Sequence, residues 1–349
     1  MKRPTKTELL LLFFIIVGAV VRFWNLGFQH TNWDENFTLS FAAPSLSAWQ
    51  IIVNSMSADY TPPLYYLMAH YSMLVFGQTP TAIRIPSAIM GVAFIPIMYL
   101  IGKQYRDELF GLIAAGFSTI YYNAIFYSRY GRSYAADFVF FSAAFYFFMR
   151  VIDGDKRSGI WFGLFALCSM WTHLYSVIPL GIMTLYLLWK NKAIDGIFVM
   201  VLGAIPLLQY ANLILTTRVA GVGSDTFGAT PLEILALTPL DIFAYSAFVI
   251  IPIVIWSCWK HRDDLLIQVI SLISLVTWGS MFLLSFKTPI IVHYAIFLVP
   301  MLLLPLILPY WESIRNRTLT VWHFYAVLVI GILEAVQIWA HFTIQRGGW

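Results

Sequence analysis

The chain has 349 residues, of which 60% are hydrophobic and 11% are charged, and its mean hydropathy is +0.77. Soluble proteins carry roughly 25% charged residues, so this composition excludes a soluble globular protein and predicts one embedded in a membrane. The net charge of +4 is small and the basic residues fall in short loops, which argues against a nucleic-acid partner.

Eleven apolar stretches are candidates to cross a bilayer, which takes about 20 residues. They lie near residues 8–26, 82–102, 109–127, 134–150, 159–175, 177–189, 194–215, 239–259, 265–285, 290–309 and 320–341. We therefore predict an all-α, polytopic membrane protein of about eleven transmembrane helices. It would be one domain, residues 1–349, without a soluble C-terminal domain.

The basic residues predict the topology. Three of them lie within the first six residues, which places the N-terminus in the cytoplasm. Basic loops near 103–106, 150–157, 190–192, 260–262 and 315–317 fall on the same side if residues 64–76 do not cross. That apolar run has only 13 residues, so we expect an interfacial or re-entrant helix. Residues 27–81 then form a long outer loop.

The outer loop carries two acidic positions. Two short stretches in it, 36–43 and 46–56, have helical apolar spacing and should lie along the interface, the second capped by Ser45 or Ser47. Asp34 and Glu35 are adjacent, and paired carboxylates at a membrane edge are candidates for chemistry. The alternative is that they only cap a helix from Asn36.

Three other outer clusters hold titratable groups. Residues 128–134 contain Arg129 and Arg132, residues 172–175 contain His173, and residues 287–294 contain Lys287 and His293. The two arginines are three apart and would share one helix face. Basic groups could hold a phosphate while a carboxylate takes a proton from an incoming hydroxyl or amine. Snorkelling arginines and a packed histidine are the alternatives.

A set of motifs resembles one family in order and spacing. They are Trp33-Asp34-Glu35, Thr61-Pro62-Pro63-Leu64-Tyr65-Tyr66, Arg84-Ile85-Pro86-Ser87, Ser128-Arg129-Tyr130-Gly131-Arg132 and His293-Tyr294 to Pro300. Across most of residues 8–310, the chain resembles GT-C membrane glycosyltransferases, in the branch of protein O-mannosyltransferases and aminoarabinose transferases.

The resemblance implies a GT-C fold and a hexosyl- or pentosyltransferase. The donor would be a polyprenyl- or dolichyl-phosphate sugar, the transfer would invert the anomeric centre, and the site would be extracytoplasmic. The acceptor is a glycan, a lipid or a protein. By the same resemblance Asp34 is the general base, and Glu35 positions the acceptor or a metal.

By the resemblance, Arg129 and Arg132 match residues near the donor phosphate. His293-Tyr294 stands where many relatives have Arg-Tyr, so His293, or Lys287 in place of the missing Arg, is the further candidate phosphate contact. The outer clusters supply the candidate donor or acceptor contacts, which are Asp59, Tyr60, Tyr134, His173 and Tyr294. Asp59 precedes two prolines and is equally a turn residue.

No cofactor is assigned. Many relatives have an Asp two residues after the second arginine, where this chain has Tyr134, and the nearest acid is Asp137. A divalent metal stays open, with Glu35 and Asp137 as its candidate ligands. The chain has no Gly-rich nucleotide loop.

Two other functions stay open. A transporter or flippase for a lipid-linked glycan would use the same basic groups, but transporters tend to carry internal repeats and charges at mid-membrane. A non-catalytic subunit of a glycan-assembly complex is the third interpretation, because the chain is short for the family. Outside the clusters, we interpret Arg84 as snorkelling and Asp241 as a helix-start residue. A hydrogen bond to a neighbouring helix is the only role suggested for Glu334.

Overall fold

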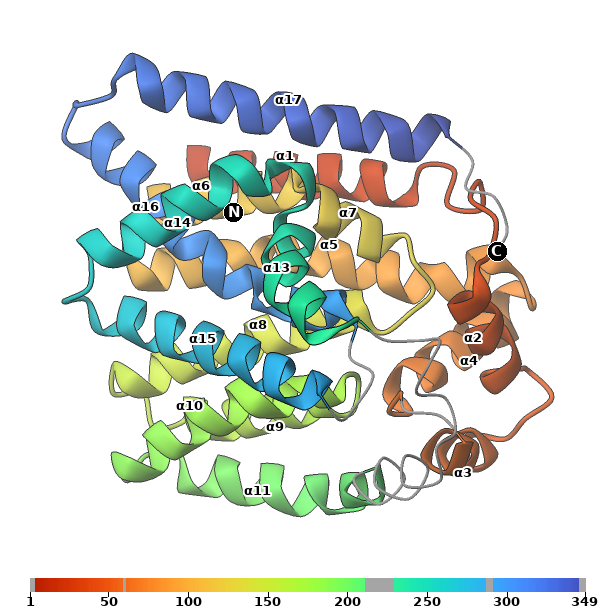
Figure 1. The fold of residues 1–349 in the computed structure, drawn as a ribbon. Coiled ribbons are helices and arrows are strands. Elements are labelled where there is room, and N and C mark those ends of the chain that lie inside the picture. Colours follow the sequence, from red (N-terminus) through yellow and green to blue (C-terminus); the bar gives the residue numbers. More distant parts are fainter. Residues whose placement is uncertain (1–3, 59–60, 211–228, 287–290, 345–349) are drawn as a thin grey trace.

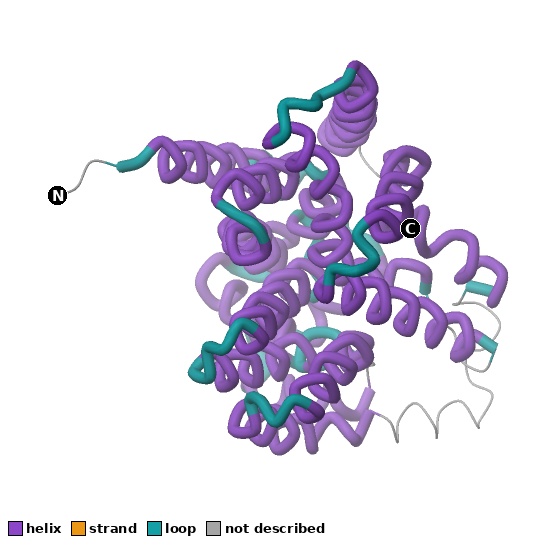
Figure 2. The backbone as a smooth tube through the Cα atoms, turned by 90° about the vertical axis from the view of Figure 1, so that its left-hand side faces the viewer, coloured by secondary structure: helices purple, strands orange, loops and turns teal. Residues whose placement is uncertain are grey.

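The computed structural model describes residues 4–58, 61–210, 229–286 and 291–344, and the regular elements in these residues are α-helices and short 3-10 helices. The long helices lie side by side and roughly parallel, while α2, α3 and α4 gather at one end of the bundle (Figure 1). Figure 2 looks along that bundle, so many helices appear end-on, joined by short loops.

The first half of the chain builds one side of the bundle and the end that holds the site. Its elements are α1 (Lys6–Phe23), α2 (Trp33–Phe41), α3 (Ala48–Ala58), α4 (Leu64–Phe76), α5 (Pro80–Tyr105), α6 (Glu108–Ile120), α7 (Tyr122–Ser128), α8 (Tyr134–Ile152) and α9 (Ser158–Met170). The expected non-crossing helix is α4, with the predicted bounds. Ser47 caps α3 as expected, because its hydroxyl accepts the Gln50 N–H at 3.3 Å.

The second half completes the bundle. Its elements are η1 (Leu174–Ser176), α10 (Val177–Trp189), α11 (Ile194–Ala204), η2 (Ile205–Leu207), α13 (Pro231–Phe243), η3 (Ala244–Ser246), α14 (Ala247–Lys260), α15 (Leu265–Ser285), η4 (Val292–Leu298), α16 (Val299–Arg315) and α17 (Val321–Thr343). Six helical segments of the described chain are long and apolar enough to span a membrane, or seven if α6 and α7 form one bent span. The predicted all-α, multi-pass architecture is confirmed, whereas the number eleven is not.

Two long helical segments are interrupted, one between α6 and α7 and the other between α13 and α14. Glu334 of α17 accepts a hydrogen bond at each interruption. Helices α6 and α7 meet at 58°. The Glu334 carboxylate accepts the Tyr122 N–H at 2.5 Å beside this bend and the Ser246 hydroxyl at 2.6 Å in η3, between α13 and α14. Hydrocarbon offers no water to freed backbone groups, so a buried acceptor at a break is stabilising. The hydrogen-bond role suggested for Glu334 is therefore confirmed.

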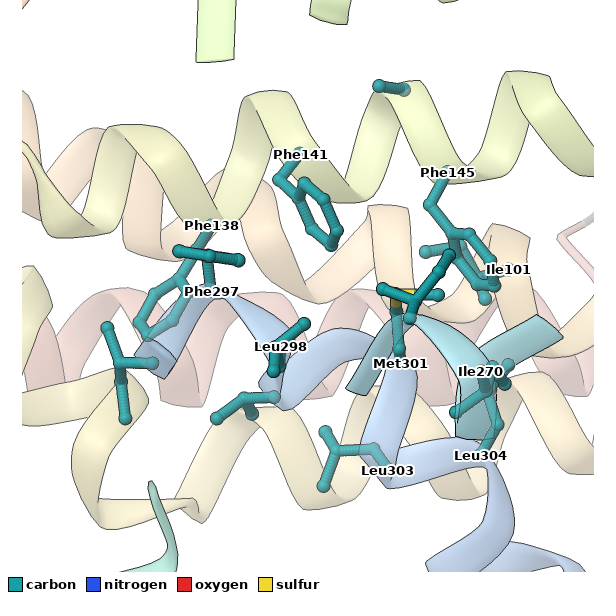
Figure 3. Close-up of a cluster of buried hydrophobic side chains, with 14 of the residues drawn as sticks. Ile101, Phe138, Phe141, Phe145, Ile270, Phe297, Leu298, Met301, Leu303 and Leu304 are labelled. Atoms are coloured by element: carbon teal, nitrogen blue, oxygen red, sulfur yellow. The ribbon is translucent and has the colours of Figure 1, made fainter. Parts of the chain in front are cut away.

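The main core lies between α8 and the η4–α16 segment. Phe138, Phe141 and Phe145 project from α8 toward Phe297, Leu298 and Met301 (Figure 3). All six side chains are at most 2% exposed. Because η4 begins at Val292, this packing also fixes His293, one turn from the core, at the end of the bundle where α2 lies.

Candidate active site

Helix α2 presents both carboxylates at its N-terminus. Asn32 is the N-cap, since its side-chain oxygen accepts the Glu35 N–H at 3.0 Å. The capping function considered for Asp34 and Glu35 therefore belongs to Asn32. Asp34 and Glu35 occupy the first turn, where the helix dipole favours negative charge. Adjacent residues on a helix point in different directions, so the two carboxylates have different surroundings.

Glu35 points into the protein and is fully paired. Arg84 of α5 donates from Nε to Oε1 at 2.7 Å and from Nη2 to Oε2 at 2.6 Å, and both side chains are buried. The Gly131 N–H also donates to Oε1 at 2.8 Å. Arg84 in addition binds the carbonyls of Leu26, Gln29 and His30. The snorkelling interpretation of Arg84 is therefore wrong, because this arginine holds residues 26–35 together from inside.

Asp34 is half-buried and carries fewer contacts. The Tyr130 hydroxyl donates to Asp34 Oδ2 at 3.0 Å, and the Asn32 amide donates to that hydroxyl oxygen at 2.5 Å. Since the amide proton faces the phenol oxygen, the phenol proton is directed at the carboxylate. Burial, with the nearby Asp34 carboxylate, raises the pKa of Tyr130, so this hydroxyl keeps its proton.

Arg132 lies beside Asp34, and Arg129 does not. Arg132 donates to the Tyr66 hydroxyl and to Thr61 Oγ1, both at 2.9 Å, and its Nη1 is 3.5 Å from the Asp34 carbonyl oxygen. Arg129 instead donates to carbonyls at the end of α1, including those of Arg22 and Trp24 at 2.9 and 2.7 Å. The two arginines do not share a helix face, because residues 129–133 form a turn and not a helix.

Most of the other candidate site residues belong to an aromatic cluster that packs against Tyr130. Tyr134 stacks on Tyr130, with ring centres 6.2 Å apart, and its hydroxyl is 3.0 Å from His293 Nε2. The His173 ring packs against Tyr134 and Tyr294 at 5.8 and 5.4 Å. Burial, with smaller contributions from His293 and Arg132, lowers the pKa of His173 to about 3. His173 is therefore neutral near pH 7 and cannot serve as a cation for a phosphate.

The two candidate metal ligands are separately engaged. Both Glu35 oxygens already accept hydrogen bonds from Arg84, and Asp137 accepts the Ser169 hydroxyl at 2.5 Å inside the bundle. Among the described residues, no three His, Cys, Asp or Glu side chains gather as a metal site. The residues present do not fit a metal bound through Glu35, since binding there would break a buried ion pair.

A cavity of about 470 Å³ opens next to Tyr130. It lies between α7, the α13–η3 turn, η4 and α17, and its lining is mostly aromatic and polar. The lining residues are Tyr122, Asn123, Phe126, Tyr127, Tyr130, Tyr134, Asp241, Ala244, Tyr245, His293, Gln337 and Ala340.

Sequence reasoning missed three contributors to this region. Tyr130 lies in the Ser128–Arg132 motif, and no function was predicted for it, although its hydroxyl is only two residues before Arg132. Asp241 lies in the last turn of α13, so its interpretation as a helix-start residue is wrong. Gln337, on a mostly lipid-exposed helix, had no signal beyond being an amide within an apolar run. Asp59, Tyr60 and Lys287 lie outside the described residues.

Comparisons with known proteins agree with this architecture. Residues 60–215 match the family model described as dolichyl-phosphate-mannose-protein mannosyltransferase. No curated protein gives a significant match to the chain. The apo oligosaccharyltransferase of Archaeoglobus fulgidus aligns with a TM-score of 0.59 at 11% identity, over 99% of this chain and 56% of that chain.

Two further solved structures are similar. AglB from Archaeoglobus fulgidus, in complex with an inhibitory peptide and a dolichol-phosphate, aligns with a TM-score of 0.58 at 11% identity, over 98% of this chain and 56% of that one. The S. cerevisiae Pmt1-Pmt2 protein O-mannosyltransferase bound to the sugar donor aligns with a TM-score of 0.45 at 19% identity, over 66% and 35% of the two chains. The chain thus spans about half the length of the archaeal structures. The fold is that of GT-C membrane glycosyltransferases, which confirms the resemblance seen in the motifs.

Proposed function

We propose that this protein transfers a hexosyl or pentosyl unit from a polyprenyl- or dolichyl-phosphate to an acceptor on the extracytoplasmic face, with inversion, and with Asp34 as the general base. The observation that carries the proposal is the contrast at the start of α2. Glu35 is locked in a buried ion pair, whereas the carboxylate of Asp34 accepts one hydroxyl among the described residues, and Arg132 lies within 3.5 Å of the Asp34 backbone carbonyl.

The reaction balances with these groups. The acceptor hydroxyl or amine gives its proton to the Asp34 carboxylate as its oxygen or nitrogen attacks the anomeric carbon. The bond from that carbon to the phosphate oxygen breaks, and the electron pair leaves with the lipid phosphate. Attack from the face opposite the phosphate inverts the anomeric centre. Arg132 supplies positive charge for the departing phosphate, and the hydroxyl of Tyr130 holds the base in place.

The donor class is supported by the comparisons. The family model that matches residues 60–215 is described by a dolichyl-phosphate sugar, and the archaeal AglB structure of the same fold holds a dolichol-phosphate. A phosphate already gives the sugar a leaving group, so the reaction needs no nucleotide site. Tyr134, His173, His293 and Tyr294 are proposed to contact donor or acceptor, since they extend the wall that begins at Tyr130.

The proposed sidedness is supported by the basic loops. Ion pairs between Arg106 and Asp264, Lys260 and Glu312, and Arg315 and Asp107 tie three of these loops together. Helices α2, α3 and α4 lie at the other end of the bundle (Figure 1). Because basic loops favour the cytoplasm, the Asp34 end would face outward.

A transfer assay tests the proposal. The full chain in lipid nanodiscs is given dolichyl and undecaprenyl phosphates carrying labelled hexoses or pentoses, with a membrane extract from cells lacking the gene as acceptor. Label should move from the donor into product, and Asp34→Asn should slow this by about 10²–10⁴-fold, as loss of a general base does. Asp195→Asn, an exposed acid near the start of α11, is the matched control and should leave the rate unchanged. Full activity in Asp34→Asn, or relocation of intact donor without product, contradicts the proposal.

A further inference from the structure

The cavity beside Tyr130 contains a carboxylate oxygen without a partner. Asp241 lines the cavity, and its Oδ2 is shut off from solvent with no hydrogen bond to the described residues. The backbone of the same residue is well held, because its carbonyl accepts the Asn123 side-chain amide at 2.8 Å. A buried acceptor that is left unsatisfied costs on the order of 1–3 kcal/mol, so this acid is kept at the cavity wall at a cost to stability.

The local backbone makes this position more costly still. Asp241 lies in the last turn of α13, where the helix dipole disfavours a negative charge. The helix ends at Ala244, whose φ of 49° is unusual for a residue with a Cβ, and Ala244 also lines the cavity. Backbone strain and acidic side chains in costly surroundings both occur preferentially at functional sites, and here they lie at the same cavity wall.

The rest of the lining restricts what can bind. Within the described part of the chain, no Lys or Arg lines the cavity, whereas Arg132 points to Tyr66 and Thr61, neither of which lines it. Among these described residues a phosphate would therefore meet a carboxylate and no Lys or Arg. Tyrosine rings offer flat apolar faces, and Asn123, Gln337 and His293 offer polar atoms. Sugar rings combine an apolar C–H face with outward hydroxyls, and a volume of about 470 Å³ falls in the usual range of ligand sites.

We propose that the cavity binds an unphosphorylated sugar ring of the acceptor, with the Asp241 carboxylate accepting a hydrogen bond from one of its hydroxyl or amine groups and tyrosines packing on its face. Tyr130 is the link to the chemistry, because it lines the cavity and donates to Asp34. Assigning this sugar to the acceptor rests on the proposed function. The binding of a sugar ring at Asp241 does not.

Protection of a single cysteine measures this binding without turnover. Cys168 and Cys258 are replaced by Ala, and Ala340→Cys places a thiol on the α17 wall of the cavity. A maleimide labels it in the presence of free glucose, mannose, galactose, arabinose, glucosamine or the matching 1-phosphates. A sugar at about ten times its Kd should slow labelling about tenfold, by mass action. Thr343→Cys, an exposed position outside the cavity lining, should be labelled at the same rate throughout.

Variants then place the sugar at Asp241. Asp241→Asn should weaken protection about 10–100-fold, as expected for a lost hydrogen bond to a charged group. If Asp241→Asn does not fold, Tyr245→Ala tests the same cavity from an exposed ring, and should weaken protection several-fold. Phe248→Ala, an equally exposed ring in α14 that does not line the cavity, is its control and should have no effect.

The outcomes separate this proposal from the proposed function. Protection by a free sugar that survives in Asp34→Asn and fails in Asp241→Asn supports the sugar site even if no transfer is ever observed. Protection that is equal or stronger with the 1-phosphate overturns it, because the ring would then belong to the donor. Protection by none of the probes, or protection unchanged in both Asp241→Asn and Tyr245→Ala, also overturns it, while Asp34-dependent transfer would leave the proposed function intact.

Discussion

The charged groups on the two sides of α2 differ in how fully they are paired. On the inner side, Glu35 and Arg84 form a buried ion pair, and Arg22 and Arg129 each satisfy helix-end carbonyls. On the cavity side, Asp34 accepts one tyrosine hydroxyl, and one Asp241 oxygen has no hydrogen-bond partner within the described ranges of the chain. A charged residue near the end of a membrane helix is therefore not by itself a sign of chemistry. The charges that stay incompletely paired are the candidates for it.

On the inner side of α2, substitution of Arg84 should cause the largest loss of stability. Arg84→Met leaves the buried Glu35 carboxylate without its partner, so the free energy of unfolding should fall by about 3–5 kcal/mol. Chemical unfolding in detergent measures this. The double variant Arg84→Met/Glu35→Leu should recover much of the loss, since it removes both charges. A single variant as stable as wild type would contradict the structural role of the pair.

Substitutions of the two arginines in the Ser128–Arg132 motif should differ in their effect on the transfer rate. Arg132→Met should lower transfer per folded molecule by about 10²–10³-fold, the usual cost of losing one group that stabilises a departing anion, and should also lower stability, because Arg132 donates to Tyr66 and Thr61. Arg129→Met should lower the free energy of unfolding by about 1.5–3 kcal/mol and leave the KM for donor unchanged, because its donors bind carbonyls of α1. Transfer rates and unfolding, measured on both variants, would show whether the roles are reversed.

His173 should make the cavity side sensitive to acid. Its pKa is lowered to about 3 in the folded protein, so the unfolded chain takes up the proton first as the pH falls below about 6.5. Stability should therefore decrease between about pH 6.5 and pH 3, by at most ~1.4 kcal/mol per pH unit from this group. Thermal unfolding of wild type and His173→Gln over this range isolates the effect. Equal slopes for the two proteins would exclude it.

The smallest expected effect is at the strained turn that follows α13. Ala244 has a positive φ, and glycine adopts that conformation without the clash of a Cβ. Ala244→Gly should therefore stabilise the fold by about 1 kcal/mol. Ala247→Gly, at the helical start of α14, is the matched control and should destabilise by about as much. A lower melting temperature for Ala244→Gly would show that the turn is not strained.

The fold could be read from the sequence because its main signal is local. Apolar run length predicted the helical segments, and the 13-residue run at 64–76 is helix α4 with the predicted bounds. The number of spans was harder, because α9, α10 and α11 are shorter than a bilayer crossing usually requires. Breaks such as the one between α6 and α7 depend on Glu334, more than 200 residues away, and no local pattern encodes that contact.

The sequence predicted which residues are candidates for the site, but not which of their charges are paired, because pairing involves contacts distant in the sequence. Residue type and order pointed to Asp34 and Arg132, but pairing depends on the tertiary structure. The partners of Arg129 are carbonyls at the end of α1, about 100 residues earlier, and carbonyls leave no trace in a sequence. Asp241 was interpreted as a helix-start residue, because an acid that lacks a partner among the described residues looks the same in sequence as one that caps a helix.

Asp34 and Glu35 are adjacent carboxylates to which we assign different functions, catalysis and structure. The transfer rate per folded molecule of Asp34→Asn and Glu35→Gln, measured side by side in one nanodisc preparation, distinguishes these functions. We predict that Asp34→Asn folds like wild type and loses about 10²–10⁴-fold in rate, whereas Glu35→Gln loses stability but transfers normally in the fraction that folds. A folded Asp34→Asn with the wild-type rate, or a folded Glu35→Gln without activity, would contradict the account.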